Sequence, residues 1–532
     1  MAMADSEMEE EEEEEEEEVV NGHGYTVDEG LSSVGFGKFQ IRMLCYAGLG
    51  YFADASELML LSFIGPALQS QWLLSSSQQT LLSTVVFAGM LVGASFWGLV
   101  SDQFGRRVSF LGISILITLS SFLSSFSPNY TVLLILRTLV GAGLGGAPVF
   151  SCWFLEFVPV SDRGKWMVVF STFWTFGTIF EAALAWIVMP RLNWRWLLAL
   201  SSLPSFGLVL FYPLIPESPR YLCAKHRLAD AQHIMENIAS LNQAKLPPGT
   251  LITDLQQHIV HGNEEAEVEN GFESKVDYAN SNTTPLLKNK EPPQPPSSLS
   301  LLFSQKYIRT TILLWVLYFG NSFSYYGIIL LTSELSAGQI KCHHSVSISR
   351  SESESGSGGD GSSSSLYVDV FITSLAEVPG IVLSAIIVDR IGRKVSMIIM
   401  FFMASVFLLP MAFNFNFNSA NLLTTGLLFG ARMCTLGTFT VACIYAPELY
   451  PTPMRATGSG VASAMGRIGG IVCPMVAVGL VAGCHQTAAV VLFLLVLLIS
   501  ALSVMLFPYE TKGQSLQDTL SASASSSSST IP

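Results

Sequence analysis

The sequence contains little charge. Only 13% of its 532 residues are Asp, Glu, Lys or Arg, whereas 50% are hydrophobic and the mean hydropathy is positive; an ordinary soluble domain has about a quarter of its residues charged. The net charge of −14 falls to −4 once the unbroken acidic run Glu9–Glu18 is set aside. This composition excludes an ordinary soluble domain and is typical of a membrane protein. We expect no nucleic-acid partner.

Motifs for metal binding and catalysis are also lacking. The eight cysteines form no CxxC pair, and most lie in apolar segments, where cysteine behaves as a small hydrophobe. No Walker loop, metal-ligand cluster or nucleophile constellation appears. We therefore expect no disulfide framework, no metal, no cofactor and no enzymatic activity. The first apolar segment follows a polyacidic tail, so a cleaved signal peptide is not expected.

Long apolar segments, in contrast, are abundant. About 20 helical residues cross the hydrocarbon core of a bilayer, and twelve segments of the chain are long enough. They are 41–65, 79–101, 108–126, 130–150, 166–188, 195–215, 310–332, 367–388, 395–413, 421–443, 459–481 and 488–507. Six precede and six follow one polar stretch. The sequence therefore predicts an all-α membrane protein with twelve transmembrane helices in two pseudo-symmetric six-helix bundles.

Composition divides the chain further. Apolar residues at helical spacing from His226 to Leu241 predict a short amphipathic helix in the polar stretch between the bundles. Like charges repel and stay solvated, and low-complexity serine runs bury little, so both are expected to be disordered. The predicted parts are an acidic tail (1–35), a first bundle (36–219), a linker (220–306), a second bundle (307–512) with a flexible extracytoplasmic loop (333–366), and a Ser-rich tail (513–532).

Lysine and arginine predict the orientation. The basic loops lie on the same side as the linker and both termini, whereas the loops 66–78, 127–129 and 414–420 contain no Lys or Arg. The positive-inside bias places both termini and the linker in the cytoplasm. We favour the plasma membrane. The pair Leu286–Leu287 resembles a dileucine sorting signal and keeps the vacuolar membrane as an alternative.

One polar motif occurs twice. Residues Gly98–Arg107 read GLVSDQFGRR, and 387–394 read IVDRIGRK. The glycine permits a tight turn between neighbouring helices, and the aspartate can pair with a nearby arginine. Because such pairs can form in one conformation and break in another, we expect them to act as gates. The matched positions are Asp102, Gly105, Arg106 and Arg107 in one copy and Asp389, Gly392, Arg393 and Lys394 in the other.

A second motif repeats after the fourth and tenth segments. The pattern Glu-x-x-Pro-x-x-x-Arg runs from Glu156 to Arg163 and from Glu448 to Arg455, and we assign these four residues to the same gating set. Each half also ends in a related motif, PESPR and PYETK. The chain therefore looks like a duplicated half. Parallel repeats of this kind place a substrate site between the halves near mid-membrane.

These motifs resemble those of the major facilitator superfamily. Within it the chain is similar to the branch of organic cation and anion transporters, sugar porters and synaptic-vesicle-2-related proteins. The first segment, Tyr51–Glu57, resembles plant organic cation/carnitine transporters and bacterial nicotinate transporters. The resemblance implies a secondary active transporter of a small organic ion. The resemblance also implies that transport proceeds by alternating access between the two halves. We expect a monomer in the bilayer.

Ionisable residues inside the spans are functional candidates, because they are costly in a membrane. Arg467 lies among glycines and offers a fork that matches a carboxylate; in the resembled branch, anion carriers tend to have an arginine here. Aromatic and acidic side chains suit a cationic nitrogen. The predicted substrate-binding set is Arg467, Asp54, Glu57, Glu181, Trp174, Tyr325 and Tyr326. The proton-coupling candidates are Asp54, Glu57, Glu181 and Arg137.

Several functions remain open. Nicotinate or a betaine-like relative, such as N-methylnicotinate or carnitine, fits the residues best, with or without a coupled proton. The alternatives are an organic cation/carnitine transporter proper, a sugar porter, or a non-transporting sensor or vesicle receptor on the same scaffold. A sugar porter is disfavoured because Asn321 is the one amide noted in the fifth, seventh and eighth segments. The fifth segment also lacks the glycine-proline motif of many antiporters.

Overall fold

The computed structural model describes residues 24–159, 162–252, 302–348, 361–413, 421–450, 452–482, 485–508 and 510–512. These residues are almost entirely helical, and one isolated bridge joins Tyr25 to Leu251. Within this part of the chain, twelve helical spans are long and apolar enough to cross a membrane. The predicted all-α class and the twelve spans are therefore confirmed.

Each half contributes six spans. In the first half they are α3 (Lys38–Trp72), α4 (Ser76–Phe104), α5 (Arg106–Ser124), α6 with α7 (Tyr130–Leu144 and Ala147–Leu155), α8 (Arg163–Val188), and α9 with α10 (Trp194–Ser201 and Leu203–Phe211). In the second half they are α15 (Ile308–Ile348), α16 with α17 (Gly361–Leu375 and Glu377–Ile391), α18 (Arg393–Ala412), α19 (Asn421–Glu448), α20 (Thr452–Ala482) and α21 (Gln486–Met505).

Local sequence explains two of the breaks within spans. Helix α7 begins just after Gly145 and Gly146, and α10 begins just after Ser202. Both carry a proline in the first turn, Pro148 and Pro204. Proline is tolerated there because the first turn has no intrahelical partner for its missing N–H. Each of these spans therefore consists of two helices separated by a short turn.

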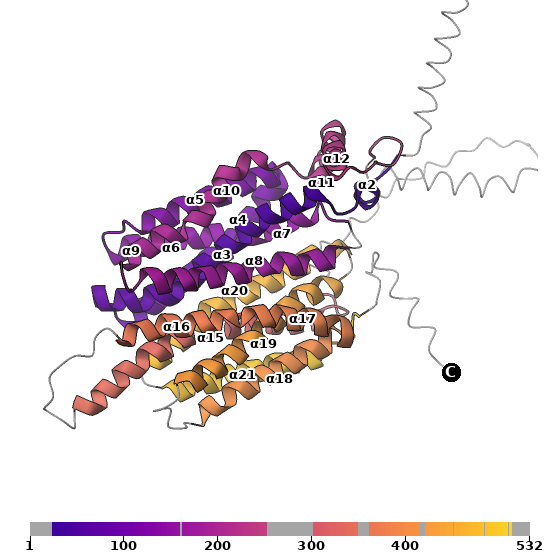
Figure 1. Cartoon of the computed structure of the whole chain (residues 1–532). Helices are drawn as coiled ribbons and strands as arrows, with labels where there is room; N and C mark the ends of the chain where they lie inside the picture. The colour runs from indigo at the N-terminus through magenta and orange to yellow at the C-terminus, as the bar shows by residue number, and fades with distance from the viewer. Residues whose placement is uncertain are drawn as a thin grey trace, which may run out of the picture.

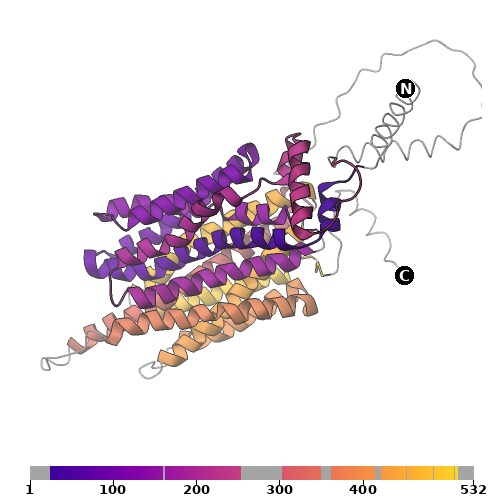
Figure 2. The same cartoon turned by 45° about the horizontal axis from the view of Figure 1, so that its top comes forward.

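The two halves lie side by side along their length (Figure 1). Three short helices gather at one end of the bundle, which we call the linker end; the opposite end is the far end (Figures 1 and 2). These helices are α2 (Val27–Val34), α11 (Pro219–Ala224) and α12 (Leu228–Asn242). Helix α12 lies where the sequence predicts an amphipathic helix in the linker.

The halves are joined at mid-span and toward the far end. Each half has its own buried apolar cluster, and a third cluster takes residues from both halves. In the third cluster Phe63 packs against Tyr367 with ring centroids 6.0 Å apart, and Trp186 packs against Phe371 at 5.5 Å. Helix α20 also packs along α4. The site between the halves is thus closed by apolar contacts on its far side.

The predicted disorder of 1–35 is wrong for residues 24–35. The hydroxyl of Thr26 accepts from the Glu29 backbone N–H, and the Glu29 carboxylate accepts from the Thr26 N–H at 2.9 Å, which completes a capping box for α2. Asp28 of this helix pairs with Arg163, at 3.2 Å, and with Arg220. Tertiary partners therefore order a segment that composition alone assigns to a tail. Residues 1–23 lie outside the described part.

The predicted loop 333–366 is also shorter than expected. Helix α15 continues to Ile348, and α16 begins at Gly361. Polar residues such as Ser and Glu do not break a helix that an apolar span has already nucleated. Of this loop, 349–360 lie outside the described residues, as do the Ser-rich tail 513–532 and Leu286–Leu287.

Candidate functional site

Two glycines make the predicted turns at the linker end. Gly105, between α4 and α5, has φ of 101°, and Gly392, between α17 and α18, has φ of 104°. Residues that carry a side chain rarely adopt this left-handed backbone conformation. A Cβ on Gly105 would also lie 2.5 Å from Oε2 of Glu217. The turn therefore requires glycine for both its conformation and its space.

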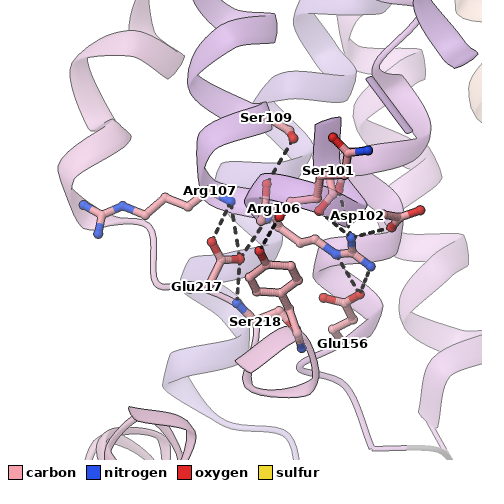
Figure 3. Close-up of polar contacts among 11 residues, drawn as sticks. Ser101, Asp102, Arg106, Arg107, Ser109, Glu156, Glu217 and Ser218 are labelled. Carbon is pink, nitrogen blue, oxygen red and sulfur yellow. Dashed lines mark hydrogen bonds and ion pairs between the residues drawn. The ribbon is translucent and has the colours of Figure 1, made fainter. Parts of the chain in front are cut away.

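The arginine after each glycine is held inside its own half. Arg106 donates to Asp102 at 2.8 Å, to Glu156 at 3.1 Å and to the Ser101 carbonyl at 2.8 Å (Figure 3). In the second half, Arg393 pairs with Glu448 at 3.3 Å. The two repeated motifs predicted from sequence thus meet in each half. In this conformation neither pair crosses to the other half.

The sequence-based site set missed two acids at these turns. Glu217 accepts from the backbone N–H of Arg106 at 2.9 Å and of Arg107 at 3.2 Å, and so caps α5 (Figure 3). Glu510 caps α18 through the N–H groups of Arg393, at 2.7 Å, and Lys394, at 2.9 Å. Carboxylates at helix N-termini satisfy free N–H groups and the helix dipole. The PESPR and PYETK motifs carried the signal.

Not every predicted gating residue joins this cluster. The guanidinium of Arg107 points away from Glu217 (Figure 3) and lies over the Tyr212 ring, 5.1 Å from its centroid. Arg163 binds Asp28 and the Val158 carbonyl instead of Glu156. The side chains of Asp389 and Arg455 lie outside the described part of the chain.

A buried ion pair lies within the first half. Arg137 of α6 donates to Glu57 of α3 at 3.0 Å and to the Ser124 hydroxyl at 3.2 Å, and both charged side chains are buried. The Ser121 hydroxyl donates to the other oxygen of Glu57. Nη2 of Arg137 has no partner among the described residues. The pair is therefore nearly, but not fully, satisfied by the protein.

Glu181 lies near this pair on α8. It is fully buried, and its Oε1 accepts from the Ser201 hydroxyl at 2.7 Å. Its Oε2 has no partner among the residues the structure describes. The charges of Glu57 and Arg137 both act on Glu181. Glu57, Arg137 and Glu181 thus form one buried acid–base–acid group.

A second buried pair belongs to a network that crosses the halves. Arg432 of α19 donates to Glu377 of α17 at 2.7 Å, and both are fully buried. The Tyr325 hydroxyl donates to Glu377 at 2.7 Å. From α8 of the first half, Thr178 donates to Glu377 at 2.9 Å, and the Trp174 indole N–H donates to the Tyr325 hydroxyl at 2.8 Å. This network ties α8 to α15 and α17 at mid-span.

A cavity adjoins this network between the halves. Trp174, Tyr325 and Tyr326 line it together with Thr178 and Ser62. Tyr325 and Tyr326 pack edge to face with centroids 5.2 Å apart. Apolar residues of α3, α4 and α15 form the rest of the wall. Three of the predicted substrate-binding residues are therefore brought together around one small, mostly apolar space.

Asp54 and Arg467 lie within electrostatic reach of each other, one in each half. Asp54 of α3 is 2% exposed, and neither carboxylate oxygen has a partner within the described part of the chain. Arg467 of α20 donates to the Met90 carbonyl of α4 at 3.1 Å, and the two opposite charges act on each other. A Cβ at Gly470 would meet the Phe87 ring at 2.6 Å, so glycine allows this close approach of α20.

The structure therefore divides the predicted substrate set. Asp54 and Arg467 are not among the lining residues of the cavity, although Tyr326 of its wall is within electrostatic reach of Arg467. Glu57 and Glu181 lie behind, with Arg137. Glu377, Arg432 and Thr178 were absent from the predicted set. The first two are charged residues inside spans, which is the signal that could have included them.

Comparison with known proteins agrees with this architecture. The model of the sugar (and other) transporter family matches residues 8–330, and that of the major facilitator superfamily matches 360–529. Organic cation/carnitine transporter 7 of Arabidopsis thaliana is 51% identical, covering 95% of this chain and 99% of that protein. The synaptic vesicle 2-related protein of Xenopus laevis is 37% identical, covering 93% and 82%.

A solved structure shows the same fold. The partially occluded, inward open xylose transporter XylE from E. coli has a TM-score of 0.65 at 16% identity, covering 90% of this chain and 99% of that one. The chain therefore belongs to the sugar (and other) transporter family of the major facilitator superfamily: it is a multi-pass membrane protein that acts as a secondary transporter and not as an enzyme.

Proposed function

We propose that this transporter carries a small organic ion that bears a carboxylate, namely nicotinate or a betaine-like relative such as N-methylnicotinate or carnitine. The observation that carries the proposal is the buried Asp54 carboxylate, which has no hydrogen-bond partner among the described residues and lies within electrostatic reach of Arg467. Burying an unpaired charge costs several kcal/mol. Such a group is retained where a ligand or a proton satisfies it in the transport cycle.

The two charges divide the substrate between them. One N–H of the Arg467 guanidinium donates to the Met90 carbonyl, and its other N–H groups can donate to a substrate carboxylate. Asp54 and the aromatic wall of Trp174, Tyr325 and Tyr326 suit a pyridinium or quaternary nitrogen. A zwitterion satisfies both ends at once, whereas nicotinate uses Arg467 and leaves Asp54 to hold a proton.

Proton coupling is the second part of the proposal. Glu181 and Arg137 each keep one polar atom without a described partner, beside the Glu57–Arg137 pair. A proton on Glu57 would weaken that pair and free Arg137 to bind Glu181. Asp54 is the other candidate acceptor. The motif pairs Arg106–Glu156 and Arg393–Glu448 are proposed as gates that form in this conformation and break in the opposite one.

The test is uptake of labelled nicotinate, N-methylnicotinate and carnitine into proteoliposomes, with and without an imposed pH gradient. We expect Arg467→Ala to abolish uptake of the carboxylates and Asp54→Asn to reduce uptake of the two zwitterions more than that of nicotinate. Glu181→Gln is expected to keep exchange but lose the response to the gradient. Arg191→Gln, an exposed arginine at the far end, is the matched control. Undiminished uptake by Arg467→Ala contradicts the assigned role.

An organic cation carrier is the second candidate. Its support is the aromatic wall together with the buried acid Glu377 behind it. Uptake of a cation without a carboxylate, at a rate unaffected by Arg467→Ala, would favour this function. A sugar is less suitable, because none of the described residues that line the cavity is Asn or Gln. Failure to bind any small organic ion would favour a sensor or vesicle receptor.

The cellular setting is part of the same proposal. We propose a monomer, with both termini and the linker in the cytoplasm, in the plasma membrane or alternatively the vacuolar membrane. Fluorescent-protein fusions at either terminus, combined with protease protection, test the location and the orientation together.

A further inference from the structure

A wide groove opens on the outer surface of the first half at the linker end. It encloses about 820 Å³ and lies outside the substrate cavity. Residues of α3 form its floor, among them Ile41, Cys45, Leu49 and Phe52, which recur at helical spacing along one face. Helix α3 is otherwise the most buried span of the twelve. On this face Ile41 and Cys45 are exposed and Leu49 and Phe52 are half-buried, because neighbouring helices leave it partly uncovered.

The packing of the first half explains the opening. Helices α8 and α10 both pack against α3, but α8 meets the sixth span mainly through α9 and not through α10. The fifth and sixth spans therefore separate toward the linker end. Phe173 of α8 and Phe211 of α10 form the two walls.

Helix α12 covers the groove from the linker end. It contributes Ile234, Asn237 and Leu241 to the lining. Leu214, 72% exposed, stands at the mouth. The groove is thus open sideways, toward the hydrocarbon that surrounds a membrane-spanning helix, and closed above by an amphipathic helix. Its shape admits an acyl chain from the side.

Two basic residues stand at the mouth. Lys38 and Arg42 are one turn apart on α3, so they share a face. Both are exposed, and neither forms a hydrogen bond or ion pair with a described residue. Arg42 belongs to the lining of the groove itself. Unpaired basic residues above an apolar groove at the end of a span match the headgroup and chain of an anionic lipid.

We propose that this groove binds one glycerophospholipid with an anionic headgroup. An acyl chain of the lipid would lie between α8 and α10, and the headgroup would contact Lys38 and Arg42. The lipid would complete the surface that the separated fifth and sixth spans leave open. It would also link α12 to the bundle. The site is separate from the substrate cavity, so it stands independently of the proposed substrate.

The test is native mass spectrometry of the full-length protein titrated with phosphatidylserine or phosphatidylcholine. Wild type is expected to retain one phosphatidylserine about tenfold more tightly than phosphatidylcholine, since each basic residue near an anionic headgroup adds attraction. The double variant Lys38→Gln/Arg42→Gln should lose that preference. Leu49→Trp, which fills the floor without changing charge, should weaken retention of both lipids.

The matched control is Lys306→Gln/Arg309→Gln. These exposed basic residues lie just before and in the first turn of α15, at the equivalent end of the second half and away from the groove. The control should bind like wild type. Equal loss in both double variants would reduce the effect to general surface charge and overturn the proposal. Equal retention of the two lipids by wild type would also overturn it. So would a protein dimer that carries no bound lipid, because a second copy of the protein would then cover the groove.

A second readout locates the lipid. Cys45 is exposed and lines the groove, whereas Cys152 is exposed elsewhere. An apolar maleimide should modify Cys45 more slowly, relative to Cys152, in vesicles that contain phosphatidylserine than in vesicles without it. The Lys38→Gln/Arg42→Gln variant should show no such difference between the two kinds of vesicle. An unchanged Cys45-to-Cys152 ratio in wild type would place the lipid outside the groove.

Discussion

Glu377 accepts a hydrogen bond from Arg432 at 2.7 Å, and neither side chain is exposed. The same carboxylate also accepts from Thr178 of the other half. One buried acid therefore balances a charge within its own half and fastens the two halves together. A transport cycle that separates the halves has to break the second contact while keeping the first.

Breaking the pair from one side should be costly. Glu377→Gln leaves Arg432 buried without its charge partner, which typically destabilises a protein by about 3–5 kcal/mol. Replacing both, as Glu377→Gln/Arg432→Met, is expected to cost less than either single change. Thermal unfolding in detergent measures this cycle, with the exposed Glu236→Gln as control. Additive losses would show that the two residues are not coupled.

The turn glycines provide a second prediction. Gly105→Ala should destabilise the protein by about 1–2 kcal/mol, because a side chain at positive φ is strained, and it should also displace Glu217 from α5. Gly392→Ala is expected to behave alike. Gly98→Ala is the control: Gly98 lies inside α4, and a Cβ added there would meet no described atom from outside its own helical backbone within 4 Å. Alanine there should be neutral or stabilising. Equal melting temperatures for Gly105→Ala, Gly392→Ala and Gly98→Ala would show that the two turns do not require glycine.

The Tyr325 hydroxyl should matter for transport. It accepts from Trp174 and donates to Glu377, so Tyr325→Phe removes two bonds of the network across the halves. A hydrogen bond to a charged group contributes about 1.5–3 kcal/mol, so we expect uptake to fall at least about tenfold. Tyr367→Phe is the control. The Tyr367 ring also packs between the halves, but none of the described hydrogen bonds between the halves involves its hydroxyl. Equal uptake by both variants would exclude a role for the hydroxyl.

Helix α2 should depend on Asp28. Asp28→Asn weakens the pairs with Arg163 and Arg220, and faster hydrogen exchange is expected across α2. Because these side chains are partly exposed, the effect is about 1 kcal/mol or less and should be mimicked by raised salt. Asp162→Asn, which removes a surface acid from Lys165 instead, is the control. Salt-independent exchange would mean that packing alone holds the helix.

Most of the fold could be predicted because the membrane restricts it. Spans need a certain apolar length and satisfied backbone groups, and both are visible in a sequence. The turn at Gly105 could be predicted for a similar reason, since its left-handed backbone excludes other residues. The short helix α2 could not, because its partners Arg163 and Arg220 lie 135 and 192 residues away.

The site was harder to predict for the same reason. Charged residues inside spans are conspicuous, so Glu57, Arg137 and Arg467 could be singled out. Their pairing could not. Asp54 and Glu57 share a face of α3, yet one pairs with Arg137 and the other faces α20. Only the packing of the halves decides which neighbour each acid meets.

The two buried ion pairs bear on how such a chain is made. Glu57 and Arg137 both belong to the first half, and Glu377 and Arg432 both belong to the second. A protein synthesised from its N-terminus can therefore neutralise Arg137 within the first half before the second half leaves the ribosome. The contacts between the halves, among them those at Thr178, Trp174 and Met90 and the packing of Phe63 against Tyr367, then form once both halves are in the bilayer.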